Sequence, residues 1–99
     1  MKEYRYNITL HSQIGKRHGT LNVIISDSGC EGTIFIMENH NNFSGTFSNG
    51  KWHLKMNLIT GIWTTECFAF GDFYEDKLEF EVQILGGKYY LSGERSELQ

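Results

Sequence analysis

The side chains best suited to chemistry in this chain are its histidines and cysteines, and their spacing matches no familiar site. The histidines and cysteines stand at His11, His18, Cys30, His40, His53 and Cys67. No pair has the His-x-x-x-His spacing of a zinc protease, and no Cys-x-x-Cys occurs. Two cysteines are also too few for a disulfide scaffold. We therefore expect no metal or other cofactor, and two reduced thiols in a cytoplasmic protein.

One carboxylate, Glu66, stands in a segment whose pattern allows two orientations. Either Phe68 and Phe70 face the interior together with Glu66, or Cys67 and Ala69 do so and the two phenylalanines face out. A bulge within the strand would reconcile the two patterns. A carboxylate held in an apolar setting has a raised pKa and is suited to acid–base work. This predicts a ligand site at one end of the fold, with the lining Tyr6, Trp52, Trp63, Glu66 and Tyr89.

Basic residues cluster at one place, Lys16-Arg17-His18, which lies near Arg5 and is suited to an anion or an acidic partner. Small β-barrels bind single strands of nucleic acid through aromatic and basic side chains on the same surface. Here the two kinds of residue fall on different segments, and the net charge of −3 disfavours phosphate binding. The chain also lacks a P-loop, a dinucleotide fingerprint and a Gly-x-Ser-x-Gly motif. We expect neither nucleic-acid binding nor a recognisable catalytic group.

A repeated tripeptide indicates the elements that must position these residues. Gly-Thr followed by an apolar residue occurs at Gly19–Leu21, Gly32–Ile34 and Gly45–Phe47, with the glycines thirteen residues apart. That interval fits one strand of roughly 5–6 residues or more and one hairpin turn. Glycine on an inner face lets a strand coil sharply and lets the opposite wall approach. The repeat therefore predicts a β-meander.

Apolar residues alternate with polar ones in eight segments, each bounded by turn residues. The predicted strands are residues 4–10, 19–26, 30–37, 43–48, 52–60, 62–70, 77–85 and 88–94. Residues 12–17 are predicted as a loop and residues 38–42 as a turn. Asn49-Gly50 predicts a type I′ hairpin, because both residue types tolerate positive φ.

The chain of 99 residues is expected to form a single all-β domain, with a frayed tail at residues 95–99. It has no apolar run long enough for a membrane helix and no signal-peptide core near Met1. Antiparallel neighbours joined by short connections close into a small up-and-down barrel or a flattened sandwich. The pattern resembles barrels of the calycin kind at the level of the fold, and fold alone does not carry function.

The outer face supplies the functional hypothesis. Alternation places Ile24, Phe35 and Met37 outward on adjacent strands, and such an apolar patch typically marks a contact surface. We expect a non-catalytic binding or interaction module that contacts another protein or forms a homodimer through this patch. The alternative is a small-molecule binder or weak enzyme that takes a small apolar ligand at the barrel mouth around Glu66.

Overall fold

The computed structural model of this chain describes residues 2–12, 15–27, 29–60, 63–72, 74–84 and 87–96, excluding the side chains of 58–60 and 63–65. The strands are β1 (Lys2–Ser12), β2 (Gly15–Ser26), β3 (Gly29–Ile36), β4 (Asn39–Ser48), β5 (Lys51–Thr60), β6 (Trp63–Asp72), β7 (Lys77–Ile84) and β8 (Gly87–Arg95). No helix in these ranges has the length and apolar character of a membrane span.

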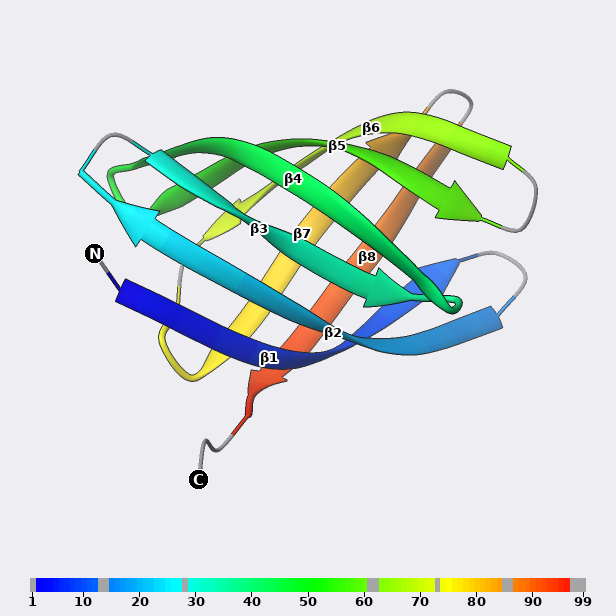
Figure 1. Ribbon diagram of the computed structural model, residues 1–99, viewed down its shortest axis with the longest axis horizontal. Helices are drawn as coiled ribbons and strands as arrows, with labels where there is room; N and C mark the ends of the chain where they lie inside the picture. The colour runs from blue at the N-terminus through cyan, green and yellow to red at the C-terminus, as the bar shows by residue number, and fades with distance from the viewer. Residues whose placement is uncertain are drawn as a thin grey trace.

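Each strand pairs antiparallel with the next strand in the sequence, and β1 also pairs with β8 (Figure 1). The meander is thereby closed into an eight-stranded barrel, which confirms the predicted fold. The barrel is flattened, with principal extents of 34 × 28 × 19 Å, and β7 and β8 cross behind β2, β3 and β4. Closure pairs the strands that would otherwise be exposed edges, and exposed edges invite aggregation.

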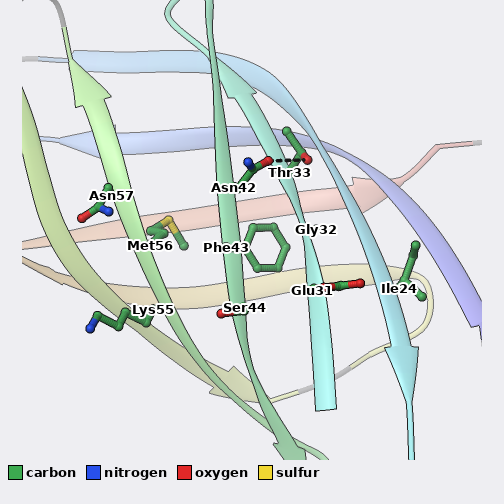
Figure 2. A pocket seen from close by; sticks show the side chains of 10 residues that line it. All are labelled: Ile24, Glu31, Gly32, Thr33, Asn42, Phe43, Ser44, Lys55, Met56 and Asn57. Atoms are coloured by element: carbon green, nitrogen blue, oxygen red, sulfur yellow. Dashed lines mark hydrogen bonds between the residues drawn. The ribbon is translucent and has the colours of Figure 1, made fainter. Parts of the chain in front are cut away.

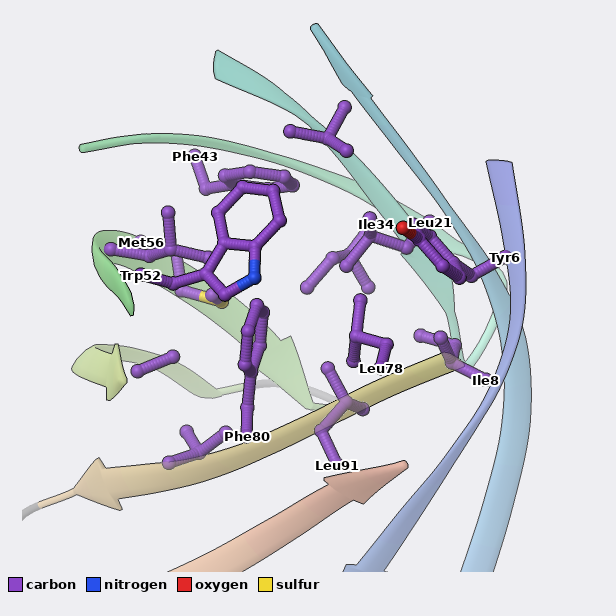
Figure 3. Packing of buried hydrophobic residues seen from close by; sticks show 14 of the residues in the cluster. Tyr6, Ile8, Leu21, Ile34, Phe43, Trp52, Met56, Leu78, Phe80 and Leu91 are labelled. Carbon is purple, nitrogen blue, oxygen red and sulfur yellow. The ribbon is translucent and has the colours of Figure 1, made fainter. Parts of the chain in front are cut away.

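The interior holds apolar residues from every strand, as the alternation predicted (Figure 3). Trp52 is 2% exposed and makes edge-on contacts with Phe47 at 5.3 Å and with Phe80 at 5.6 Å between ring centroids. An eight-stranded barrel is just wide enough for side chains to fill it. The core therefore uses its large aromatic residues to span the barrel.

The pairing of β6 resolves the ambiguity around Glu66. Its register with β5 runs without interruption from Lys51 opposite Asp72 to Thr60 opposite Trp63, so the bulge considered from the sequence is absent here. Residues directly opposite one another share a face of the sheet. Cys67 lies opposite Met56, which is buried, and so Cys67 faces inward while Phe68 is 49% exposed.

The connection between β3 and β4 is shorter than predicted. Met37 and Glu38 have φ values of 52° and 63°, and Ile36 pairs with Asn39 directly across this two-residue turn. Positive φ at both positions is the mark of a type I′ turn. The sequence did not predict this turn, because neither Met nor Glu favours positive φ. The predicted turn at 38–42 is therefore wrong, and 39–42 belong to β4.

Two further turns test the sequence analysis. Asn49 and Gly50, with φ values of 54° and 75°, confirm the predicted type I′ hairpin between β4 and β5. The predicted loop at 12–17 is wrong, because β2 begins at Gly15 and Ser12 pairs with Gly15. Lys16 pairs with His11 and Arg17 with Leu10, so residues predicted as loop belong to the β1–β2 ladder.

Because β4 begins at Asn39, the polar side chain of Asn41 faces the core. Asn41 is 2% exposed, and its Nδ2 donates hydrogen bonds to the carbonyls of Ile34 at 3.4 Å and Asn39 at 3.3 Å. A buried amide without partners would cost about 1–3 kcal/mol. The backbone of the β3–β4 hairpin thus offsets the burial of Asn41.

The repeated glycines lie where neighbouring strands approach closely. A Cβ at Gly19, Gly32 or Gly45 would collide with the backbone oxygen of Phe35, Asn22 or His53 respectively. The crowding that these glycines relieve thus comes from the adjacent strand, and not from the opposite wall as the sequence analysis proposed. Glycine is required because no flexible side chain can give way.

Tyr6 ties β1 to the connection between β6 and β7. Its buried hydroxyl donates to the carbonyl of Tyr74 at 3.2 Å and lies 3.5 Å from that of Glu75. Arg95 closes the same end, since its N–H donates to the Asp76 carbonyl at 2.9 Å and its guanidinium lies 3.7 Å from Glu75. Arg95 thus belongs to β8, while residues 97–99 of the predicted tail lie outside the described residues.

Replacing Tyr6 with Phe tests this tie. Burial, together with the nearby Tyr4, raises the pKa of Tyr6 from 10.0 to about 12. The folded state holds this proton more tightly than the unfolded state, so stability is lost as pH rises from 10 towards 12. We expect Tyr6→Phe to lower the free energy of unfolding by about 1 kcal/mol at neutral pH. Urea unfolding against pH should show a smaller alkaline loss in the variant, and equal losses would contradict the assignment.

Adding one methyl group at Gly45 tests the close approach of strands. The Cβ of Gly45→Ala would force β4 away from the carbonyl of His53, and such overpacking costs about 1–3 kcal/mol. Gly87 is the matched control, because a Cβ there meets nothing within 4 Å. Thermal unfolding should show a lower Tm for Gly45→Ala and little change for Gly87→Ala. Equal Tm values for the two variants would exclude the steric explanation.

Candidate functional site

The residues predicted to line the barrel mouth do not meet at one site. Glu66 lies on the outer face, where its carboxylate is 3.5 Å from the ammonium of Lys55 and its side chain is 55% exposed. Tyr6 and Trp52 are buried in the core, and Tyr89 is half-buried against it. Trp63 begins β6, and its side chain lies outside the described part of the chain. The barrel wall therefore separates the carboxylate from the aromatic residues.

The predicted interface residues are also spread apart. Ile24 lies opposite Glu31, and Phe35 lies opposite Thr20, four residues further along the β2–β3 ladder. Four residues correspond to about 13 Å. Met37 turns inward at the hairpin and packs against the core, while Phe35 contacts His40 with 4.5 Å between ring centroids. These side chains form isolated contacts and not one apolar patch.

Exposed aromatic side chains stand instead on the outer faces of β6 and β8, on either side of β7. Phe68 is 49% and Tyr90 59% exposed, and Phe70 is partly exposed on β6. Phe70 and Tyr90 both lie opposite Glu81 of β7, so the two rings flank one carboxylate. We call Phe68, Phe70 and Tyr90 the aromatic face. From the sequence, an outward orientation of Phe68 and Phe70 was one of two alternatives. The exposure of Tyr90 was not predicted.

The charges around the aromatic face cancel. Lys55 lies 3.5 Å from Glu66, and Lys88 lies 3.5 Å from Glu81. All four of these side chains project from the outer surface of β5, β6, β7 and β8. The surface thus combines exposed rings with two cations and two anions in contact with each other.

A groove crosses the outer surface of β3, β4 and β5, with a volume of about 610 Å³ (Figure 2). Its polar side chains are Glu31 and Thr33 from β3, Asn42 and Ser44 from β4, and Lys55 and Asn57 from β5. The hydroxyl of Thr33 donates to Oδ1 of Asn42 at 3.2 Å. Ile24 of β2 adds an aliphatic wall. We call this the β3–β5 groove.

A second groove of about 560 Å³ crosses β1, β2, β7 and β8 and carries more charge. Its lining includes Lys77, Glu79 and Glu94. Beside it, Nε2 of His11 lies 3.0 Å from the hydroxyl of Ser92, as a serine nucleophile and its base would. No described hydrogen bond joins a carboxylate to His11, so the third group that orients such a base is missing from the described contacts.

The two cysteines lie in positions that give a thiol low reactivity. Both Cys30 and Cys67 are buried and free of disulfide bonds. Burial raises the pKa of Cys30 to about 11, so its thiol stays protonated at neutral pH. Reactive cysteines have the opposite combination of exposure and a lowered pKa. Across the described residues, no three His, Cys, Asp or Glu side chains are grouped to hold a metal ion.

Comparisons with known proteins returned no match among protein-family models, curated proteins or solved structures.

Thiol labelling measures the burial of Cys30 directly. A rise in pKa from 9.0 to about 11 lowers the thiolate fraction about a hundredfold at neutral pH. We expect Cys30, isolated in a Cys67→Ala variant, to react with a chromogenic disulfide more than a hundredfold more slowly in the folded than in the urea-unfolded chain. Comparable rates in the two states would show that the β3 wall is open to solvent.

Proposed function

We propose that this chain is a non-catalytic interaction module that associates with a second copy of itself through the aromatic face. The observation that carries the proposal is the exposure of Phe68 and Tyr90 on β6 and β8, the two strands that flank β7. Elsewhere each of these strands alternates polar side chains outward, as a solvated wall does. Full burial of a phenylalanine side chain stabilises a complex by about 1.5–3 kcal/mol before the costs of association.

Charge favours a second copy over a charged partner. The whole chain has a net charge of −3, so two copies repel each other at most orientations. The ion pairs Lys55–Glu66 and Lys88–Glu81 leave the surface around the aromatic face without net charge. Two copies can therefore approach there at little electrostatic cost. An isologous two-fold contact, in which the same patch meets itself, is the commonest arrangement for small homo-oligomers.

The alternative of a small-molecule site at the barrel mouth has less support. It required Glu66 to face the aromatic side chains of the interior, and Glu66 instead contacts Lys55 on the outside. The hydroxyl of Tyr6 is engaged by the carbonyl of Tyr74. The aromatic face also replaces the Ile24, Phe35 and Met37 patch in the proposal, because only Phe35 of these three is prominently exposed.

Phe68→Asp is the variant that tests this proposal. We expect light scattering after size exclusion to give a dimer for the native chain at high micromolar concentration and a monomer for Phe68→Asp. The new carboxylate would sit beside Glu66 and would have to be desolvated twice in a symmetric contact. Phe35→Asp is the matched control, since it adds the same charge to another exposed ring, and it should remain dimeric.

The outcomes separate the two surfaces. Loss of the dimer in Phe35→Asp and its retention in Phe68→Asp would move the interface to the β2–β3 surface predicted from the sequence. A native chain that stays monomeric at every concentration would remove self-association altogether.

A further inference from the structure

We propose that the β3–β5 groove binds a neutral saccharide. Two hydroxyl and two amide side chains line it, together with Glu31 and Lys55. Its apolar lining comes from Ile24, Phe43 and Met56. Hydroxyls and amides match the alternating donors and acceptors of sugar hydroxyl groups. The groove meets the aromatic face at Lys55, which lies opposite Phe68, but the saccharide proposal does not rest on the proposed function.

Two of the groove's polar side chains are joined by a hydrogen bond, and strand pairing fixes the spacing of the backbone from which the others project. Register places Thr33 opposite Asn42 and Glu31 opposite Ser44, so two rows of side chains cross the groove (Figure 2). The hydrogen bond from Thr33 to Oδ1 of Asn42 orients the amide group. The Nδ2 hydrogens then point away from Thr33. Donors fixed on paired strands lose little side-chain entropy when they bind.

Charge and topology exclude other classes of ligand. Lys55 is balanced by Glu66, and Glu31 leaves the groove slightly negative, which disfavours nucleic acids and other polyanions. An extended peptide binds a sheet by adding to a free edge, and β3, β4 and β5 each pair on both sides. Six polar or charged side chains line the groove, and a lipid chain would take water from them without offering hydrogen bonds in return. A neutral ligand rich in hydroxyl groups satisfies all three conditions.

The shape of the groove fits a short oligosaccharide. Its volume of about 610 Å³ lies within the usual range of roughly 300–1,000 Å³ for ligand sites. Ile24 is half-buried at the β2 side, where its aliphatic surface can contact the C–H face of a pyranose ring. The site therefore offers both polar and apolar contacts to a sugar.

Titration of the native chain with saccharides, followed by amide chemical shifts, tests the proposal. Neutral trisaccharides of glucose, mannose and N-acetylglucosamine serve as separate probes, with a sulfated trisaccharide as the anionic comparison. We expect saturable shifts confined to the groove with at least one neutral probe. Asn42→Ala and Ser44→Ala should each weaken binding about tenfold, the loss expected for one hydrogen bond of about 1.4 kcal/mol.

Matched controls use the same residue types on the opposite wall. Asn7→Ala and Ser92→Ala, in the charged groove of β1 and β8, should leave the affinity unchanged. Thr33→Val keeps the shape of the side chain and removes the bond to Asn42, so it should weaken binding even if an alanine variant folds poorly. The proposal is overturned if no neutral probe gives saturable shifts, if the shifts fall outside the groove, or if the sulfated probe binds more tightly. Because Lys55 lies opposite Phe68, the same titration is run on Phe68→Asp, so that a groove covered by the dimer is told apart from a groove that binds no sugar.

Discussion

Closure of the sheet is the constraint on which the rest of this structure depends. The hydrogen bonds between β1 and β8 join the first strand to the last, and every residue must then face either the interior or the solvent. A barrel of this size has no space for a misplaced large side chain. The adjacent strands also press so close that Gly32 and Gly45 accept no Cβ, because a neighbouring carbonyl occupies its place. The repeated glycines thus stand where the neighbouring strand leaves no room for a side chain.

Alternation in the sequence predicts the strands well wherever each strand has a single apolar face. β7 shows this most clearly, since Leu78, Phe80 and Val82 are all buried as expected. Prediction failed at the β3–β4 connection because Met37 and Glu38 adopt positive φ without being residues that favour it, so local turn chemistry gave no sign of the hairpin. That error in turn hid Asn41, whose burial depends on the carbonyl of Ile34 across the hairpin.

The candidate surfaces were harder to predict than the fold, for a related reason. In β6 both faces carry apolar residues, and pairing with Met56 and Leu54 of β5 decides that Cys67 and Ala69 lie inside. Periodicity within one strand contains no information about its neighbour's register. The same limit separates Ile24 from Phe35, which share adjacent strands but lie at different levels of the ladder. A contact surface depends on register, whereas a strand depends only on its own alternation.

Closure also determines where this protein can meet other molecules. The core residues fill the interior, and the backbone N–H and C=O groups of the strands are bonded to neighbouring strands. Side chains on the outer wall are therefore the groups that can bind another molecule. That wall has two chemically distinct regions. Exposed rings with balanced charges around Phe68 suit an apolar, self-complementary contact, while the hydroxyls and amides around Asn42 suit a neutral polar ligand. Lys55 borders both regions, and its pairing with Glu66 keeps either one from becoming a site for anions.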